Sequence, residues 1–349
     1  MNETKKICST GIMQNRIGFA SINTFVIFLF IFICTLISAT QIFGLSRDID
    51  NYKDFFNDLN LGGISLLDLS RFEPGFVLFS YSIIKIIQND VLAYSAIVGL
   101  SLFFKLKIID LKKISVLYLI VILLLYFFRY FPLHELTQLR VACSISLLLL
   151  GLGYIERKNF LVGRFFLIAS IFFHFSMIAV IPFLFFPQFT SRIKLIVFLG
   201  AAFALLKLFS VFILQYAAQY VYVLSLHADN GNFTDIIPNG LSPFVLLDLA
   251  TTIYFFILWP KITYFTRQII FLQAFGLIVF YSTIDLGLIA IRMKEVFGIF
   301  YFMGFYGMLR DKASNKSCIF LIFLNILIYG YTYFFYKDIP FFNVGQSSF

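Results

Sequence analysis

Charge is scarce in this sequence: only 13% of its 349 residues are Asp, Glu, Lys or Arg, whereas 60% are hydrophobic. A soluble domain cannot bury that much apolar side chain, and the apolar runs approach the roughly 20 residues that a helix needs to cross a bilayer. The shortage of charge therefore excludes a soluble class and leaves no room for a soluble domain between the runs. The sequence predicts an all-α, polytopic integral membrane protein.

Cysteine is also scarce, and the sequence lacks the common cofactor motifs. It contains no phosphate-binding loop, Ser-His-Asp pattern or HExxH helix, so it predicts no metal and no nucleotide cofactor. The net charge of +9 is spread over short loops, which indicates membrane topology and no nucleic acid partner. The four cysteines are too far apart for a metal or redox motif: Cys8, Cys34, Cys143 and Cys318.

The apolar runs predict about ten or eleven transmembrane or re-entrant helices in one membrane domain, residues 1–349. Lys5, Lys6 and Arg16 precede the first run, Ile17 to Ser38, which places the N-terminus in the cytoplasm by the positive-inside rule. This run is too long for a signal-peptide core and is predicted to be a retained first helix.

Two large loops are predicted on the outer side, at residues 39–75 and 215–243. The first should contain an amphipathic helix that lies along the membrane, because its aromatic and apolar residues recur at helical spacing. Glu73-Pro74 should begin the next helix, since Pro is accepted in a first turn. The residues at helical spacing are Tyr52, Phe55, Phe56 and Leu59.

Two stretches leave the topology open. The pieces 76–87 and 91–104 follow an outer loop and precede a lysine group, Lys105 to Lys113, which we expect in the cytoplasm. Two full crossings that start outside would leave these lysines outside. The run 161–187 is too short for two full crossings at ~1.5 Å per residue. A broken or re-entrant pair that turns near His174 is the prediction for this run.

Polar residues gather between two long apolar runs, in the segment Phe131 to Arg140. His134, Glu135, Gln138 and Arg140 lie there, at the predicted membrane face. Ionisable groups at this depth are costly unless they face water or a partner, so a functional site is the first interpretation. The alternative is structural, with polar residues that cap a helix and an interfacial Arg that snorkels.

The charge rule places most carboxylates and histidines on the outer side, where neither ATP nor soluble nucleotide-sugars are available. An activated substrate would therefore be lipid-linked. Arg140 and Arg292 are candidate diphosphate ligands, because Arg contacts phosphate oxygens in a bidentate manner.

Candidate bases for an attacking sugar hydroxyl are Asp50, Glu73, His134 and His174. Each has a structural alternative. Asp50 and Glu73 would solvate or cap helices, His174 would bond a backbone carbonyl at a helix break, and Arg292 would form a helical salt bridge with Glu295.

The order of several short motifs resembles the EpsG-like membrane proteins and the Wzy-type polymerases of bacterial O-antigen and exopolysaccharide. The motifs extend from about residue 18 to residue 310. They are Asp48-Ile-Asp50-Asn-Tyr52, Phe72-Glu73-Pro74-Gly75, Gln138-Leu-Arg140-Val-Ala142, Ala169-Ser-Ile-Phe-Phe-His174-Phe-Ser176, and Arg292 followed by an aromatic helix.

The resemblance implies a multi-pass enzyme of the bacterial inner membrane, with its site facing the periplasm or cell exterior. Such an enzyme joins undecaprenyl-diphosphate-linked oligosaccharides, as donor and acceptor, within membrane lipid. A chain-length regulator and a flippase are further candidate partners. The outer acidic loop followed by Glu-Pro is similar, more loosely, to class C glycosyltransferases. The implied site residues are Asp50, Glu73, Arg140, His174 and Arg292, with Gln138 and His134 added from the polar segment.

Two other functions fit parts of the sequence. A transporter of lipid-linked oligosaccharide would place polar residues through the bilayer midplane and show an inverted repeat, whereas this chain concentrates them toward one face and shows no repeat. A membrane acyltransferase that modifies the glycan would use a dedicated His site, and His134-Glu135 keeps that alternative open.

Overall fold

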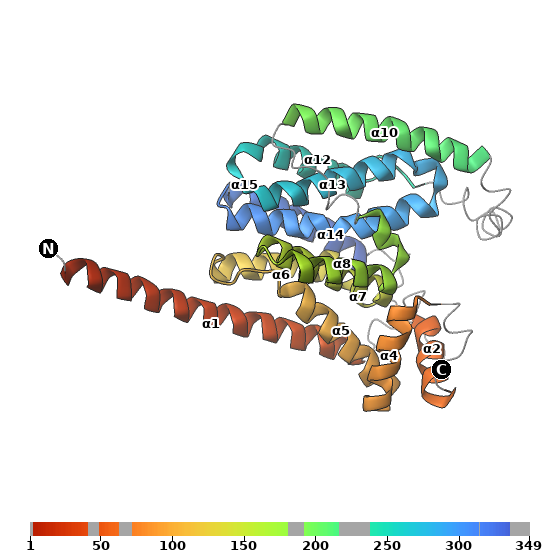
Figure 1. The fold of residues 1–349 in the computed structure, drawn as a ribbon, viewed down its shortest axis with the longest axis horizontal. Helices are drawn as coiled ribbons and strands as arrows, with labels where there is room; N and C mark the ends of the chain where they lie inside the picture. Colours follow the sequence, from red (N-terminus) through yellow and green to blue (C-terminus); the bar gives the residue numbers. More distant parts are fainter. Residues whose placement is uncertain are drawn as a thin grey trace. The chain divides into compact units, whose positions relative to one another are not determined.

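The computed structural model describes residues 3–40, 49–62, 72–180, 192–215, 238–313 and 315–335. Helices and their short connections make up these ranges, with no strand among them, so the predicted all-α class is confirmed (Figure 1). Chain contacts divide the molecule into two compact units, residues 1–177 with 322–349 and residues 178–321. Each unit is described by itself.

The first unit is built from helices of very different length. α1 is long and includes the predicted first apolar run, whereas α4 and α6 are short. The helices are α1 (Glu3–Thr40), α2 (Ile49–Gly62), α4 (Pro74–Ile87), α5 (Asp90–Leu106), α6 (Val116–Arg129), α7 (Leu139–Glu156) and α8 (Phe160–Phe173), with a π-helical turn η1 (Phe131–Glu135) between α6 and α7.

Among its described residues, the second unit has four helices that belong to it entirely and short 3-10 turns. α15 (Asn315–Phe335) begins in this unit's part of the sequence and ends in the first unit's part. The other elements are η2 (Phe175–Ala179) at the boundary, α10 (Arg192–Gln215), α12 (Pro243–Ile257), η4 (Trp259–Lys261), α13 (Tyr264–Ser282), η5 (Ile284–Leu286) and α14 (Leu288–Arg310).

Helix starts follow local capping chemistry. The Asn89 side chain accepts a hydrogen bond of 3.0 Å from the backbone N–H of Leu92 and begins α5. Ser115 begins α6 in the same way, through the N–H of Tyr118 at 3.3 Å. Glu73 is the extended residue before α4, with Pro74 in the first turn, so the predicted helix start is confirmed.

Four described segments are long and apolar enough to cross a membrane: Ile22–Thr40, Leu139–Glu156, Ile193–Ser210 and Tyr264–Ser282. Shorter apolar helices accompany them, including α4, α6, α8 and α12. Together they identify the protein as a polytopic integral membrane protein.

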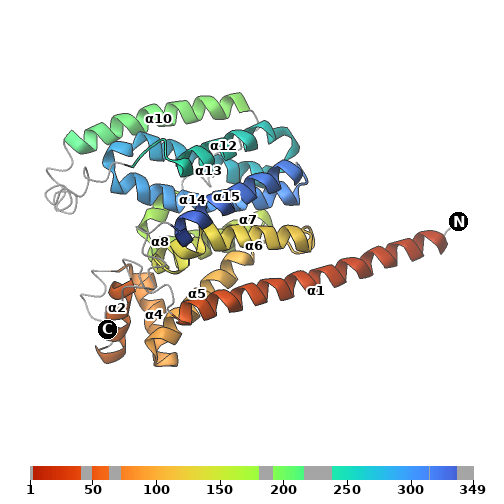
Figure 2. The ribbon, with the colours of Figure 1, turned by 180° about the vertical axis from the view of Figure 1, so that it is seen from behind.

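Small residues bring α8 close to α7 in the first unit. A Cβ added to Gly151 would lie 2.9 Å from the carbonyl oxygen of Gly163 on α8, so only glycine permits this approach. The Ser144 hydroxyl also donates to the Ser170 carbonyl at 2.6 Å. The two helices therefore lie side by side (Figures 1 and 2). α8 also contacts α4, and the site described below is at that contact.

The predicted amphipathic helix is α2, and its apolar face packs against protein. Phe55 and Phe56 are fully buried, and the Phe55 ring lies 4.4 Å from that of Phe72. α2 packs on α4 and α5. Residues 41–48 and 63–71 of the first predicted loop, and 216–237 of the second, lie outside the described residues.

The apolar run 161–187 is interrupted where the sequence predicts a turn. α8 ends at Phe173, His174 is extended with φ −162° and ψ 116°, and η2 follows. Residues 181–191 lie outside the described part of the chain. The predicted break at His174 is thus confirmed, within the part of the run that ends at residue 180.

Candidate active site

A close helix contact brings Glu73 and His174 together, although they are 101 residues apart in sequence. Gly75, in the first turn of α4, packs on the last turn of α8. A Cβ added to Gly75 would lie 2.8 Å from the Phe172 carbonyl oxygen, so the two turns touch only because this residue is glycine. Glu73 precedes that turn of α4, and His174 follows that turn of α8.

The Glu73 carboxylate binds two partners, one with each oxygen. His174 Nδ1 lies 2.8 Å from Oε1, and Arg140 Nη1 donates to Oε2 at 2.8 Å. The Glu73 side chain is 7% exposed, that of His174 15% and that of Arg140 30%. The Glu73 carboxylate is therefore enclosed at the centre of the cluster, whereas the side chains of His174 and Arg140 keep surface that a ligand could contact.

Arg140, in the first turn of α7, is held by two aromatic residues as well. Its guanidinium lies 4.9 Å from the centre of the Phe72 ring, in cation–π contact. Its backbone N–H donates to the Tyr52 hydroxyl at 3.3 Å, and the Tyr52 ring stacks on Phe72 at 6.0 Å. α2, α4 and α7 thus all contribute to the position of Arg140.

The environment of Glu73 keeps its carboxyl group ionised. Burial by itself would raise its pKa, but the hydrogen bond from His174 and the charges of Arg140 and His174 outweigh burial and lower the pKa from 4.5 to about 2. Because an ionised carboxylate only accepts hydrogen bonds, the His174 nitrogen that faces it carries the proton. A neutral His174 ring then presents Nε2 as its proton acceptor.

The remaining predicted site residues lie elsewhere. Asp50 is in the first turn of α2, but its side chain lies outside the described residues. His134 is fully buried in η1, with its ring 5.8 Å from that of Tyr130, and Gln138 is buried just before α7. Full burial leaves no surface of His134 for a substrate. Residues 131–138 also interrupt the helix, so α7 begins only at Leu139.

Arg292 lies in α14 of the second unit. Its Nη1 lies 3.4 Å from Glu295 Oε2, the helical salt bridge that the sequence leaves open as an alternative. The Arg292 side chain is 43% exposed, so the pair leaves the guanidinium accessible to a ligand.

The sequence did not reveal a second charged cluster, which lies inside the first unit. Lys105 forms an ion pair with Glu135, and both side chains are fully buried. Lys105 Nζ and Glu135 Oε1 also bond the Tyr126 hydroxyl, at 3.0 and 2.7 Å. Grouping by charge places Lys105 with the lysines of a predicted cytoplasmic loop, but in the structure it lies on the buried face of α5, four residues after Ser101. Residues four apart lie on the same face of a helix, so this spacing could have indicated from the sequence that Lys105 points inward.

Comparison with protein families gives a match to the EpsG family over residues 24–344. The chain belongs to the EpsG family. Membership associates this integral membrane protein with exopolysaccharide biosynthesis. A comparison with curated proteins and one with solved structures gave no match.

Proposed function

We propose that this EpsG-family protein is a polysaccharide repeat-unit polymerase. It would be a membrane glycosyltransferase that joins undecaprenyl-diphosphate-linked oligosaccharides on the outer face of the bacterial inner membrane. The observation that carries the proposal is the Glu73 carboxylate, which holds a histidine and an arginine at 2.8 Å each, with both partners accessible.

The cluster fits glycosyl transfer from a lipid diphosphate. A hydroxyl oxygen of the acceptor unit attacks the anomeric carbon of the donor glycan, and the bond from that carbon to the diphosphate oxygen breaks. Undecaprenyl diphosphate leaves with the electron pair, and the hydroxyl proton passes to Nε2 of His174. The Glu73 carboxylate orients the ring and stabilises the imidazolium that forms, as a carboxylate does for histidine bases in general.

Arg140 supplies positive charge for the leaving diphosphate. The Arg140 side chain is 30% exposed, and its buried Nε has no hydrogen-bond partner among the described residues. A diphosphate oxygen would satisfy that donor and draw charge stabilisation from the same group. Arg292, accessible on α14, is a second candidate for this role, and Asp50 remains a candidate from the motif order.

A glycan gel tests the function. A host strain that lacks the gene is complemented with the wild type or with Arg140→Ala, Arg292→Ala or His174→Ala, and membrane protein levels are measured. We expect the wild type to restore a ladder of chain lengths and the variants to leave a single repeat unit on its anchor at normal protein levels. Arg157→Ala, at the far end of α7, is the matched control and should restore the ladder.

The same gel separates the rival functions. Loss of a lipid-linked oligosaccharide transporter would remove the single repeat unit as well, and loss of an acyltransferase would leave chain length unchanged. Either pattern in the deletion strain contradicts the polymerase assignment. Full ladders from all three variants would contradict the proposed site.

A further inference from the structure

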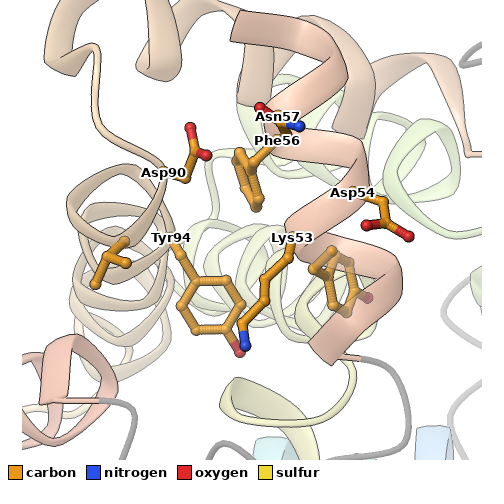
Figure 3. Close-up of a pocket in the computed structure, with 8 residues that line it drawn as sticks. Lys53, Asp54, Phe56, Asn57, Asp90 and Tyr94 are labelled. Atoms are coloured by element: carbon orange, nitrogen blue, oxygen red, sulfur yellow. The ribbon is translucent and has the colours of Figure 1, made fainter.

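A cavity of about 330 Å³ lies between α2 and the first two turns of α5, within the first unit. Figure 3 shows its lining, with side chains that come from α2 on one side and from α5 on the other. Its volume is at the lower end of the range for small-molecule sites, about 300 to 1,000 Å³. The lining residues are Tyr52, Lys53, Asp54, Phe56, Asn57, Asp90, Val91 and Tyr94.

The lining combines aromatic rings with groups that bond hydroxyls. Tyr52, Phe56 and Tyr94 contribute rings, and ring faces attract the C–H groups of a flat molecule. Carboxylates and an amide accept hydrogen bonds from hydroxyls, and the amide also donates. A pyranose sugar has this dual character, with a patch of C–H groups and a rim of hydroxyls.

One polar atom of the cavity wall lacks a partner. Asp90 Oδ1 is buried and has no hydrogen bond among the described residues. A buried acceptor without a donor is costly, and a ligand hydroxyl would remove that cost. In Figure 3 the carboxylate of Asp54 is turned away from Asp90 and Tyr94, so Asp90 is the acid better placed to receive a ligand.

The charge of the lining restricts the ligand further. Asp54 and Asp90 against Lys53 give a formal charge of −1. This field disfavours acidic sugars and favours neutral ones.

The cavity is connected to the Glu73–Arg140–His174 cluster through one residue. Tyr52 forms part of the cavity wall, and its hydroxyl accepts the backbone N–H of Arg140. Its ring stacks on that of Phe72, and the Phe72 ring is in cation–π contact with the Arg140 guanidinium. A ligand in the cavity would therefore lie against the residue that fixes the start of α7.

We infer that this cavity is a saccharide subsite, which binds a neutral sugar residue of the lipid-linked repeat unit beside the catalytic cluster. The inference rests on the proposed function, since it names the substrate part that the α2–α5 cavity holds. It assigns α2 a direct role in glycan selection.

The test blocks the cavity without removing any hydrogen bond. Val91→Trp adds a large side chain at the wall, and Leu92→Trp is the matched control, since Leu92 is the next residue on α5, is 55% exposed and does not line the cavity. The probe is the oligosaccharide repeat unit released from the host polysaccharide without its lipid. Its binding to the purified proteins in nanodiscs is measured by calorimetry.

We expect Val91→Trp to weaken binding of the repeat unit at least about tenfold and Leu92→Trp to bind as the wild type does. Asp90→Ala should also weaken it about tenfold, because a charge-assisted hydrogen bond is lost. If Val91→Trp does not reach normal membrane levels, Asp90→Ala carries the test. Wild-type affinity in a folded variant, or no binding by the wild type, overturns the subsite.

Arg140→Ala separates this inference from the function itself. It keeps the backbone N–H that bonds Tyr52, so the lipid-free repeat unit should still bind while polymer is lost. If Arg140→Ala makes polymer normally and Val91→Trp still loses binding, the proposed mechanism fails and the subsite stands. If Arg140→Ala loses polymer and Val91→Trp binds and polymerises as the wild type does, only the subsite fails.

Discussion

Two charged clusters in the first unit differ in how much of their side-chain surface is exposed. Glu73, Arg140 and His174 form a cluster whose arginine and histidine keep exposed surface. The cluster of Lys105, Glu135 and Tyr126 is fully buried. Both contain a carboxylate between two hydrogen-bonding partners, so residue type alone does not distinguish them.

The buried cluster joins helices. Glu135 and Lys105 connect the turn before α7 to α5, and the Tyr94 hydroxyl donates to the Glu135 carbonyl at 2.7 Å. No substrate can reach these side chains, so their value is structural. Under the proposed function, the cluster that can meet a substrate is therefore the one whose arginine and histidine keep exposed surface.

The largest expected effect follows from replacing the exposed carboxylate. Glu73→Gln keeps the shape but removes the charge that stabilises a protonated His174. We expect kcat for polymer formation to fall about 10²- to 10⁴-fold with little change in KM and in membrane level. The assay is polymer formation in membranes supplied with lipid-linked repeat units.

Asp58→Asn is the control for that change, because Asp58 is an exposed acid on α2 outside the cavity lining. A Glu73→Gln protein that polymerises at the wild-type rate would contradict a catalytic role for the Glu73 cluster.

Replacing the buried carboxylate should act on folding instead. Glu135→Ala leaves Lys105 as an uncompensated buried charge, which should lower the free energy of unfolding by about 3–5 kcal/mol. Denaturant unfolding in detergent measures the loss. A variant that unfolds like the wild type but makes no polymer would show that this cluster takes part in catalysis.

Low pH should reveal how much the ionised Glu73 of the exposed cluster contributes to folding stability. Because the pKa of Glu73 is lowered from 4.5 to about 2, its ionisation stabilises the folded state above pH 4.5, and that stability is lost as pH falls toward 2. The loss should reach about 3 kcal/mol at most. Unfolding free energies measured between pH 6 and pH 2.5 should fall less steeply for Glu73→Gln. Equal slopes would mean that the ion pair and hydrogen bond do not hold Glu73.

The helix contact beneath the exposed cluster gives a smaller effect. Gly75→Ala would place a Cβ 2.8 Å from the Phe172 carbonyl oxygen and force α4 and α8 apart, at a cost of about 1–3 kcal/mol. Polymer formation should fall as well, since Glu73 and His174 flank that contact. Gly200→Ala in α10 is the control, because an added Cβ there meets nothing within 4 Å; it should be neutral or slightly stabilising.

The smallest effect is expected when both members of the buried pair become apolar. Lys105→Met with Glu135→Leu removes two buried charges together, so stability should return to within about 1 kcal/mol of the wild type, and polymer formation should persist. Unfolding and the glycan gel measure both. A folded double variant without polymer would contradict a purely structural role.

Much of the fold follows from local sequence. Hydropathy predicted the polytopic all-helical class, Glu73-Pro74 predicted the start of α4, and the polar interruption predicted the break at His174. The aromatic spacing predicted α2 but not the helices against which it packs, because lipid and a protein surface attract the same apolar face.

The sequence by itself determined the class, the helix starts and the set of candidate residues, because hydropathy, capping and periodicity depend on neighbours along the chain. Tertiary structure alone decided that Glu73 meets Arg140 and His174, across 67 and 101 residues, and that Lys105 turns inward to Glu135. Such pairings depend on which helices approach closely, and here that approach depends on glycines and serines on α4, α7 and α8. Electrostatic attraction then acts only between the groups that packing has already brought within reach.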